Sequence, residues 1–230
     1  MRWPRIPRPR SQEDDPARDR ARMVAEQLEA RGLRDPELLR AFGAVERHRF
    51  VEGSEAYGDH ALPVGSGQTI SQPYVVAMMT NFARPPDGWA GANVLEVGTG
   101  SGYQAAILAE LGARVTSIER HESLATTARQ RLADAGYGAN VEVVVGDGTQ
   151  GWPAHEPYRS VMVTAGAPSV PGPLLEQLDW AGGRLIMPVG NREHQLLTLV
   201  VREGDELRTE ELEPVVFVPL IGEHGYRPDP

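Results

Sequence analysis

The segment from Glu96 to Gly102 reads Glu-Val-Gly-Thr-Gly-Ser-Gly and is the part of the chain best suited to hold a ligand. It follows an apolar run and precedes a helix-forming stretch, so we predict a loop that joins a strand to a helix. Glycine allows tight turns and lets a ligand approach the backbone closely. A dinucleotide-binding loop, G-x-G-x-x-G, would need glycine at position 103, where this chain has Tyr103. The loop residues expected at the ligand are Gly98, Gly100, Ser101 and Gly102.

Three acidic residues stand near the ends of three successive predicted strands. Glu96 enters the glycine loop, Glu119 closes the next strand, and Asp147, followed by Gly148, closes the third. In an open parallel sheet these ends face the ligand crevice. Glu96 suits a cationic amino group, Glu119 suits ribose hydroxyls, and Asp147 suits the exocyclic amine of adenine. Each acid alone fits a helix cap or a solvated loop equally well, but together they favour S-adenosylmethionine over a dinucleotide.

The elements that must position these residues follow from hydrophobic spacing. Strands and helices that alternate from about residue 93 indicate βαβ units and a parallel sheet. Gly32 suits the end of one helix and Asp35 the N-cap of the next, whereas residues 50–75 are expected to be loop. Closely spaced strands, with a turn at residues 204–205, follow residue 184. The predicted helices are 18–30, 36–45, 73–82, 104–111 and 121–135, and the predicted strands are 94–97, 115–118, 141–145, 160–164, 184–189, 195–202, 207–212 and 215–218.

This pattern predicts the α/β class with a doubly wound, mostly parallel sheet. Helices are expected before the sheet and an antiparallel strand section after it. A chain of 230 residues suits one such domain. The expected divisions are a disordered N-terminal arm over 1–17, a single domain over 18–222 with parts 18–90, 91–183 and 184–222, and a tail over 223–230.

The composition excludes several kinds of chemistry. The chain has no cysteine and no lysine, and its 23 Lys+Arg residues are all arginine, which excludes disulfides, thiolate nucleophiles and Schiff-base lysines. The six histidines are scattered without metal-ligand spacing, so no metal is expected. A net charge of −9 disfavours nucleic acid as a partner. No apolar run approaches the ~18–20 residues of a membrane span, so no membrane contact is expected. We find no export signal and expect a cytoplasmic protein.

Two segments, ALPVGSGQTISQP over 61–73 and VLEVGTGSGYQAA over 94–106, resemble the protein-L-isoaspartate O-methyltransferase family. Further matches begin at Arg47, and the resemblance covers roughly residues 20–222. It implies the Rossmann-like fold of S-adenosylmethionine-dependent methyltransferases. Its most specific part is Thr69-Ile70-Ser71, because generic methyltransferases share only the glycine loop. The resemblance implies methyl transfer from S-adenosylmethionine to the α-carboxylate of L-isoaspartyl residues in damaged proteins and peptides, with S-adenosylhomocysteine as the product. The ester then closes to a succinimide, whose hydrolysis returns some normal aspartate.

The resemblance also implies roles for particular residues. Ser71 is the active-site serine, expected to position the substrate carboxylate or to order the cofactor loop and not to act as a covalent nucleophile. A serine at this place also suits capping of the helix that starts near Pro73. A carboxylate is already ionised at pH 7, so no general base is required. The expected substrate contacts are Thr69, Ser71, Thr164 and Val218, and the expected cofactor contacts are Thr69, Ile70, Ser71, Glu96, Gly98, Gly100, Ser101, Gly102, Glu119, Arg120, Asp147, Gly148 and Gln195.

Arg159 departs from the family, which usually has aspartate at this position, and we expect a local structural change there. Two alternative functions stay open at this point. One is a paralogue that methylates ordinary aspartate in a dedicated peptide, and the other is a cofactor-binding protein without turnover. Such paralogues tend to carry an added C-terminal region, whereas this sequence stops about ten residues after Leu220, which favours repair. We expect a monomer whose partners are isoaspartyl proteins and peptides.

Overall fold

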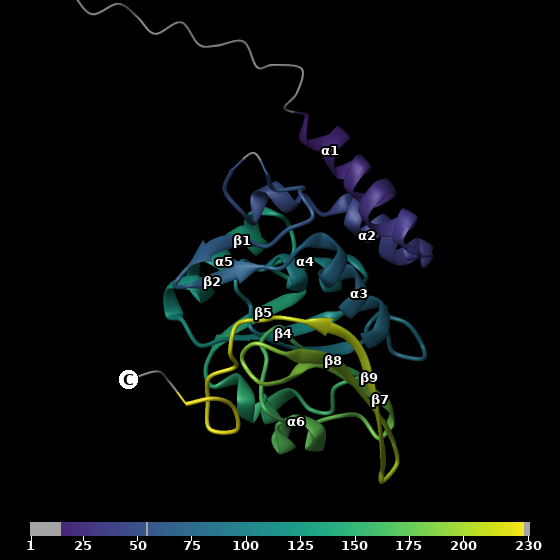
Figure 1. Ribbon diagram of the computed structural model, residues 1–230, viewed down its shortest axis with the longest axis vertical. Coiled ribbons are helices and arrows are strands. Elements are labelled where there is room, and N and C mark those ends of the chain that lie inside the picture. The colour runs from purple at the N-terminus through teal and green to yellow at the C-terminus, as the bar shows by residue number, and fades with distance from the viewer. Residues whose placement is uncertain (1–14, 54, 228–230) are drawn as a thin grey trace, which may run out of the picture.

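A seven-stranded sheet forms the centre of the computed structural model, in which residues 15–53 and 55–227 are described. The strands are β3 (Asn93–Val97), β4 (Arg114–Glu119), β5 (Val141–Val145), β6 (Ser160–Val163), β7 (Ala181–Gly190), β8 (Gln195–Glu203) and β9 (Glu206–Val215). Their spatial order is β5-β4-β3-β6-β7-β8-β9 (Figure 1). The first five in this order run parallel, and β8 and β9 extend the sheet as antiparallel neighbours. The predicted mostly parallel sheet is therefore confirmed.

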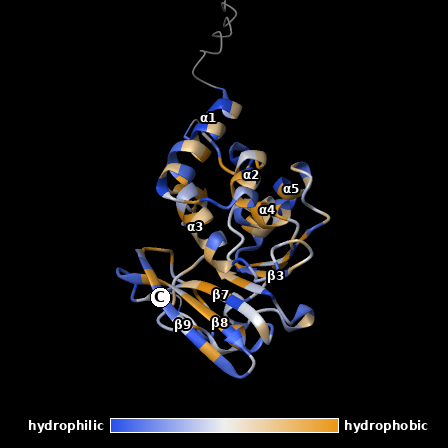
Figure 2. Ribbon diagram, turned by 90° about the vertical axis from the view of Figure 1, so that its right-hand side faces the viewer, coloured by the Kyte–Doolittle hydropathy of each residue, from blue (hydrophilic) through white to orange (hydrophobic). Residues whose placement is uncertain are grey.

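Helices cover both faces of this sheet. The helices that pack on it are α3 (Pro73–Ala83), α4 (Tyr103–Glu110), α5 (Glu122–Asp134) and α6 (Gly172–Glu176). Successive side chains of a strand point to opposite faces, so Val94 packs in the core beneath α3, α4 and α5, while Leu95 packs in the core beside α6. In Figure 1 α3 and α4 lie on one side of the strands and α6 on the other. In Figure 2 hydrophobic residues are concentrated on β7 and β8. The short α6 was not predicted.

The first helical segment begins two residues earlier than predicted. Asp15 is the N-cap of α1 (Pro16–Arg22), and its side chain accepts hydrogen bonds from the next N–H groups. The helix continues as a π-helical stretch (Met23–Leu28) and a 3₁₀ turn (Glu29–Arg31). It ends at Gly32, which has a φ of +97° as a C-terminal glycine should. Residues 16 and 17 of the predicted arm are thus helical, and its residues 1–14 lie outside the described part of the chain.

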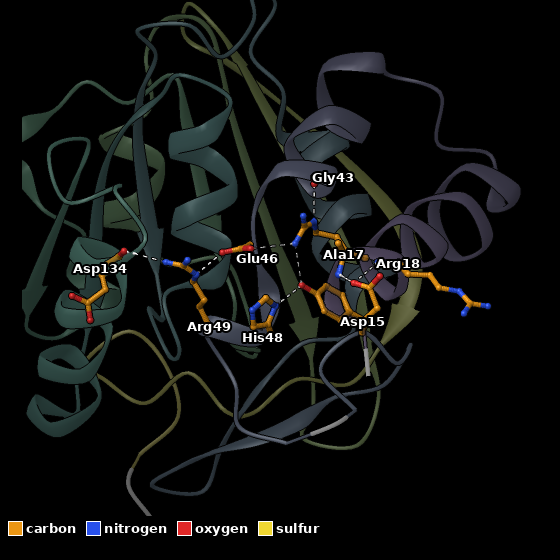
Figure 3. A network of polar contacts seen from close by, with 10 residues as sticks. Asp15, Ala17, Arg18, Gly43, Glu46, His48, Arg49 and Asp134 are labelled. Atoms are coloured by element: carbon orange, nitrogen blue, oxygen red, sulfur yellow. Dashed lines mark hydrogen bonds and ion pairs between the residues drawn. The ribbon is translucent and has the colours of Figure 1, made fainter. Parts of the chain in front are cut away.

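A polar network attaches the N-terminal helices to the rest of the domain (Figure 3). α2 (Pro36–Ala44) starts after the predicted N-cap Asp35. The Arg20 guanidinium donates to the Gly43 carbonyl at the end of α2 and forms an ion pair with Glu46 at 3.7 Å. The Glu46 carboxylate also pairs with Arg49, whose guanidinium donates to the Asp134 carbonyl at the end of α5. These contacts position the segment that leads into the candidate site.

The prediction of a loop over residues 50–75 was wrong in part. β1 (Leu62–Gly65) and β2 (Gln68–Ile70) form an antiparallel hairpin that is separate from the main sheet. Its turn, Ser66-Gly67, has φ angles of +51° and +70°. Two successive positive φ angles are typical of tight hairpin turns, whose twist matches that of the strands. The hairpin carries Thr69 and Ile70 and ends one residue before Ser71.

The C-terminal strands also differ from the prediction. The expected strands 207–212 and 215–218 are instead one strand, β9, which ends at Val215. The chain then leaves the sheet, and Gly166 pairs with Pro219 in an isolated bridge. The predicted turn at residues 204–205 is present, with a φ of +63° at Gly204. Leaving the sheet early brings residues 218–221 to the carboxyl ends of the parallel strands, where they face the hairpin across a cavity.

Candidate active site

The cavity opens at the carboxyl ends of the central strands, where doubly wound sheets bind their ligands. Counting the part that is open to solvent, it includes about 870 Å³ of space not filled by atoms. Its walls are the hairpin end, the glycine loop and the segment after β9. The predicted site residues that line it are Thr69, Ile70, Ser71, Gly98, Gly100, Ser101, Glu119, Arg120, Gly148, Thr164 and Val218. Glu96, Gly102, Asp147 and Gln195 are not among the lining residues.

Glu119 fixes the glycine loop from the end of β4. One carboxylate oxygen accepts the Gly100 N–H at 2.9 Å, and the other accepts the His121 N–H at 3.0 Å. A carboxylate has about four acceptor positions, so positions remain for the hydroxyls of a ribose. The side chain is almost fully buried, yet Glu119 lines the cavity. This placement supports the ribose role, which stays a prediction.

Gly98 and Thr164 fit tightly together on the floor of the cavity. The Thr164 hydroxyl donates to the carbonyl of Gly98 at 2.8 Å and lies within 3.1 Å of the carbonyl of Val97. Gly98 has a φ of +96°, and a β-carbon there would collide with the Thr164 hydroxyl. Both the conformation and the space therefore require glycine. Gly102 serves the same loop differently: with a φ of +90° it is the N-cap of α4.

The expectation that Glu96 offers a carboxylate to the ligand is not met in this structure. Its side chain is fully buried below the loop and accepts a hydrogen bond from the Ser117 hydroxyl, which is itself 2.6 Å from the Thr99 hydroxyl. The other carboxyl oxygen has no hydrogen-bond partner. Burial, aided by the nearby Glu119, raises the pKa of Glu96 to about 8. The raised pKa favours the neutral form at neutral pH, and the side chain supports the loop through Ser117 and Thr99.

Asp147 also differs from the expectation, because its carboxylate binds protein groups. One oxygen accepts the Thr149 N–H at 2.9 Å and the Thr149 hydroxyl at 2.7 Å, and the other accepts the Glu223 N–H at 2.8 Å. These hydrogen bonds lower the pKa of Asp147 against the opposing effect of burial. Residues 223–227, assigned to the tail, are therefore part of the ordered domain. Gly148 lines the cavity next to this junction, so the adenine role of Asp147 stays a prediction.

Gln195 has a structural position behind the cavity wall. Its amide oxygen accepts the Phe217 N–H at 2.8 Å, and its amide nitrogen donates to the Phe217 carbonyl at 3.3 Å. This pairing fixes the chain just before Val218, which does line the cavity. The structure therefore places Gln195 as a support for Val218, in contrast to the direct cofactor contact that was expected.

Ser71 lies between the hairpin and α3, half-buried at the edge of the cavity. The N-cap of α3 is Gln72, and no side chain caps this helix, so the capping role considered for Ser71 is not observed. Ser71 lines the same cavity as Gly100 and Glu119. The structure thus brings the Thr69-Ile70-Ser71 segment and the glycine loop to one site, although more than 20 residues separate them in the sequence.

Over residues 15–53 and 55–227 there is no group of three histidine, cysteine or acidic side chains arranged to hold a metal ion. Within the same ranges, no helix combines the length and the apolar character needed to cross a bilayer.

A sequence model of the family described as protein-L-isoaspartate(D-aspartate) O-methyltransferase (PCMT) matches residues 19–225. The chain belongs to this family. A protein-L-isoaspartate O-methyltransferase of Methanoculleus marisnigri is 51% identical over 222 residues, which are 94% of this chain and 97% of the relative. A protein-L-isoaspartate O-methyltransferase 2 of Pelobacter propionicus is 53% identical over 209 residues, 89% of this chain and 91% of the relative.

Solved structures agree with this membership. One protein-L-isoaspartate O-methyltransferase is 27% identical, with a TM-score of 0.79, over 90% of this chain and 67% of that chain. A PCMT from Plasmodium falciparum, in complex with S-adenosyl-L-homocysteine, has a TM-score of 0.75 at 22% identity, over 86% of this chain and 96% of that chain. The second similarity supports the fold alone. The Rossmann-like methyltransferase fold predicted from the sequence is confirmed.

Several residues of this PCMT family member line the site but were missed by sequence reasoning. Tyr103 was read only as the residue that breaks a dinucleotide pattern, yet it lines the cavity and is almost fully buried. Aromatic residues that directly follow a glycine loop are the signal for such a role. The other unassigned lining residues include Gln68, Thr99, Gln104, Pro219, Leu220 and Ile221.

Proposed function

We propose that this protein transfers a methyl group from S-adenosylmethionine to the α-carboxylate of L-isoaspartyl residues in damaged proteins and peptides. The ester begins repair by closing to a succinimide. Family membership supports this function, and one structural observation carries it: Ser71 and the glycine loop line a single cavity. The predicted monomeric state and cytoplasmic location belong to the same proposal.

The cavity residues fit S-adenosylmethionine. Glycines with positive φ leave open space beside Gly100, where a β-carbon would meet no atom within 4 Å. Glu119 faces this space with acceptor positions to spare, as a ribose requires. Bound there, the cofactor supplies an electrophilic methyl group on a positively charged sulfur. The residues proposed to hold it are Gly98, Gly100, Ser101, Glu119, Arg120 and Gly148.

The residues of this chain then act mainly by alignment. The substrate carboxylate is ionised at pH 7 and attacks the methyl carbon, so the carbon–oxygen bond forms as the carbon–sulfur bond breaks. No histidine is among the lining residues, in keeping with a reaction that needs no general base. Ser71 donates a hydrogen bond that orients the carboxylate. Correct alignment alone gives effective molarities of about 10⁵–10⁸ M.

The test is methyl transfer to matched peptides that differ only in one residue, L-isoaspartate or L-aspartate. We expect labelled methyl ester from the isoaspartyl peptide, and no comparable labelling of the aspartyl peptide. A third peptide, with the isoaspartyl α-carboxylate blocked as an amide, controls for methylation elsewhere. Preferential labelling of the aspartyl peptide would support the paralogue reading. Calorimetric binding of S-adenosylhomocysteine with neither peptide labelled would support a protein without turnover.

A further inference from the structure

A buried arginine lies directly behind the segment that carries Ser71. Arg47, in the 3₁₀ turn Arg47–Arg49, is completely buried. Its Nε donates to the Ala56 carbonyl at 2.7 Å, and its Nη2 donates to the Ser71 carbonyl at 2.7 Å. These two carbonyls lie before and after the hairpin β1–β2. One guanidinium therefore fixes both ends of the segment that forms the substrate side of the cavity.

The same guanidinium also contacts the cofactor side. Its Cζ lies 4.8 Å from the centroid of the Tyr103 ring, which follows the glycine loop and lines the cavity. Phe42 and Phe50 pack around that ring, with centroid distances of 6.2 and 5.8 Å. Arg47 is thus located between the serine segment and the start of α4, and it holds them in one fixed relation.

Simple packing does not explain a charge at this position. No carboxylate of the described residues lies within ion-pair distance of Arg47, although the charge of Asp59 acts on it from farther away. Its buried Nη1 lacks a hydrogen-bond partner. Burial lowers the pKa of Arg47, but arginine stays protonated at neutral pH. Burial of a charge without an ion pair is costly, and an apolar side chain of similar volume would avoid that cost. A planar group with several fixed donors does offer something that an apolar side chain lacks: it orients two carbonyls at once.

We propose that Arg47 is a positioning residue for methyl transfer, which holds the Ser71 backbone at a fixed distance from the glycine loop. This inference rests on the proposed function. The hydrogen bonds of Arg47 go to the residues on either side of the hairpin and none goes to the glycine loop, so we expect a larger effect on turnover than on cofactor affinity. Since misplacement by about 1 Å can cost about 100-fold in rate, a change at Arg47 should act on turnover.

The test compares Arg47→Met with a matched control, Arg202→Met. Arg202 likewise donates to backbone carbonyls, those of Leu175, Glu176 and Leu178, and its Cζ lies 3.8 Å from the centroid of the Trp180 ring, beside α6. We expect Arg47→Met to lower kcat by about 10- to 100-fold, with S-adenosylhomocysteine affinity nearly unchanged. Arg202→Met should lower the Tm and leave kcat per folded molecule unchanged. Equal kcat in both variants would overturn the inference.

A double-mutant cycle tests whether Arg47 acts through Ser71. If it does, Arg47→Met should slow the Ser71→Ala enzyme much less than it slows the wild type. Additive losses would contradict the proposal. Should Arg47→Met not fold, Arg47→Lys keeps the charge but lacks the planar fork that orients two carbonyls, so it should also lower kcat. Guanidinium ion at millimolar concentration should partly restore kcat to an Arg47→Ala enzyme. If the wild type does not methylate the isoaspartyl peptide, the proposed function fails. If the wild type methylates this peptide and both Arg47→Met and Arg47→Lys have the same kcat as the wild type, only the inference about Arg47 fails.

Discussion

The two walls of the cavity are built in different ways. The cofactor wall comes from consecutive elements, β3, the glycine loop, α4 and β4, and Glu119 joins the loop to β4 within that unit. The substrate wall is a two-stranded hairpin outside the main sheet, and its strands are largely solvent-exposed or half-buried. Its connections are long-range, through buried Ile70 and the guanidinium of Arg47. The first wall is thus fixed by the strongest part of the fold, whereas the second depends on a few contacts.

The largest effect is expected from breaking the cofactor wall at Gly98. Gly98→Ala forces an L-residue into a φ of +96°, which costs roughly 1–2 kcal/mol, and it also pushes against the Thr164 hydroxyl. With a clash of comparable cost, S-adenosylhomocysteine affinity should fall by about 100-fold in calorimetry. Gly136→Ala is the control, since its φ is +89° and a β-carbon there meets nothing within 4 Å. If both variants bind equally, the loop is not the cofactor wall.

The substrate wall is tested by Ser71→Ala. A hydrogen bond to a charged acceptor is worth roughly 1.5–3 kcal/mol, so kcat/KM on the isoaspartyl peptide should fall by about 10- to 200-fold. Affinity for S-adenosylhomocysteine should change little, in contrast to Gly98→Ala. Ser66→Gly, in the hairpin turn with a φ of +51°, controls for changes to the hairpin itself. Collapse of cofactor affinity would move Ser71 to the cofactor wall, and a trapped acyl-serine would exclude direct transfer.

The difference between the two walls also explains which features of the site could be predicted from the sequence and which could not. The parallel sheet, the glycine loop and the position of Glu119 depend on local patterns, and the structure agrees with them. The hairpin was missed because its turn, Ser66-Gly67, lies in a stretch rich in glycine and proline, with short strands. The environments of Glu96 and Asp147 depend on Ser117 and Glu223, which are 21 and 76 residues away. No pattern along the chain specifies which distant donor a carboxylate will meet.

A smaller effect on the cofactor wall is expected from Glu119→Ala. Loss of the acceptor for a ribose hydroxyl should weaken the binding of S-adenosylhomocysteine by about 1–3 kcal/mol, the usual cost of leaving a buried donor without its acceptor. The same change releases the Gly100 N–H, which adds to the effect. Glu122→Ala, an exposed acid in the first turn of α5, is the control in the same titration. An affinity like that of the wild type would remove Glu119 from the ribose role.

Glu96 should affect stability more than catalysis. Its pKa is raised from 4.5 to about 8 in the folded protein, so between these values the folded state holds a proton that the unfolded state has lost. The contribution of Glu96 to the free energy of unfolding is therefore fully present below pH 4.5. As the pH rises from 4.5 toward 8, this contribution is lost by about 1.4 kcal/mol per pH unit. Glu96→Gln, neutral at every pH, should remove this slope.

Urea unfolding of the wild type and Glu96→Gln at pH 5.5, 7 and 8.5 measures that difference directly. The free energy of unfolding of Glu96→Gln, relative to that of the wild type, should increase from pH 5.5 to pH 7 and again to pH 8.5. The rate of methyl transfer by the variant at pH 7 should stay close to that of the wild type, because the side chain that glutamine replaces is already neutral. Parallel stability curves would show that Glu96 is ionised in the folded state, in which case it could meet a cationic group after all.

The smallest effect on methyl transfer is expected at Arg159, which belongs to neither wall. Its guanidinium pairs with Asp87 at 2.6 Å and with Asp179 at 3.2 Å, and its backbone N–H donates to the Asn93 carbonyl at the start of β3. The Asp87 hydrogen bond raises the pKa of Arg159 and lowers that of Asp87. These contacts connect Arg159, just before β6, to the segments that precede β3 and β7. They lie at the amino ends of the strands, so the cavity at the opposite edge of the sheet does not depend on them.

Arg159→Asp, which introduces the aspartate expected from the family, places a third negative charge beside Asp87 and Asp179. The Tm should fall by more than it does in Arg159→Gln, which removes the attraction without adding repulsion. Added salt should reduce the difference in Tm between the two variants, because it screens the repulsion. For both, kcat/KM and S-adenosylhomocysteine affinity at a temperature well below the Tm should match the wild type. A selective loss of turnover in Arg159→Asp would show that the two edges of the sheet are coupled. Catalysis would then depend on the amino ends of the strands as well as on the two walls.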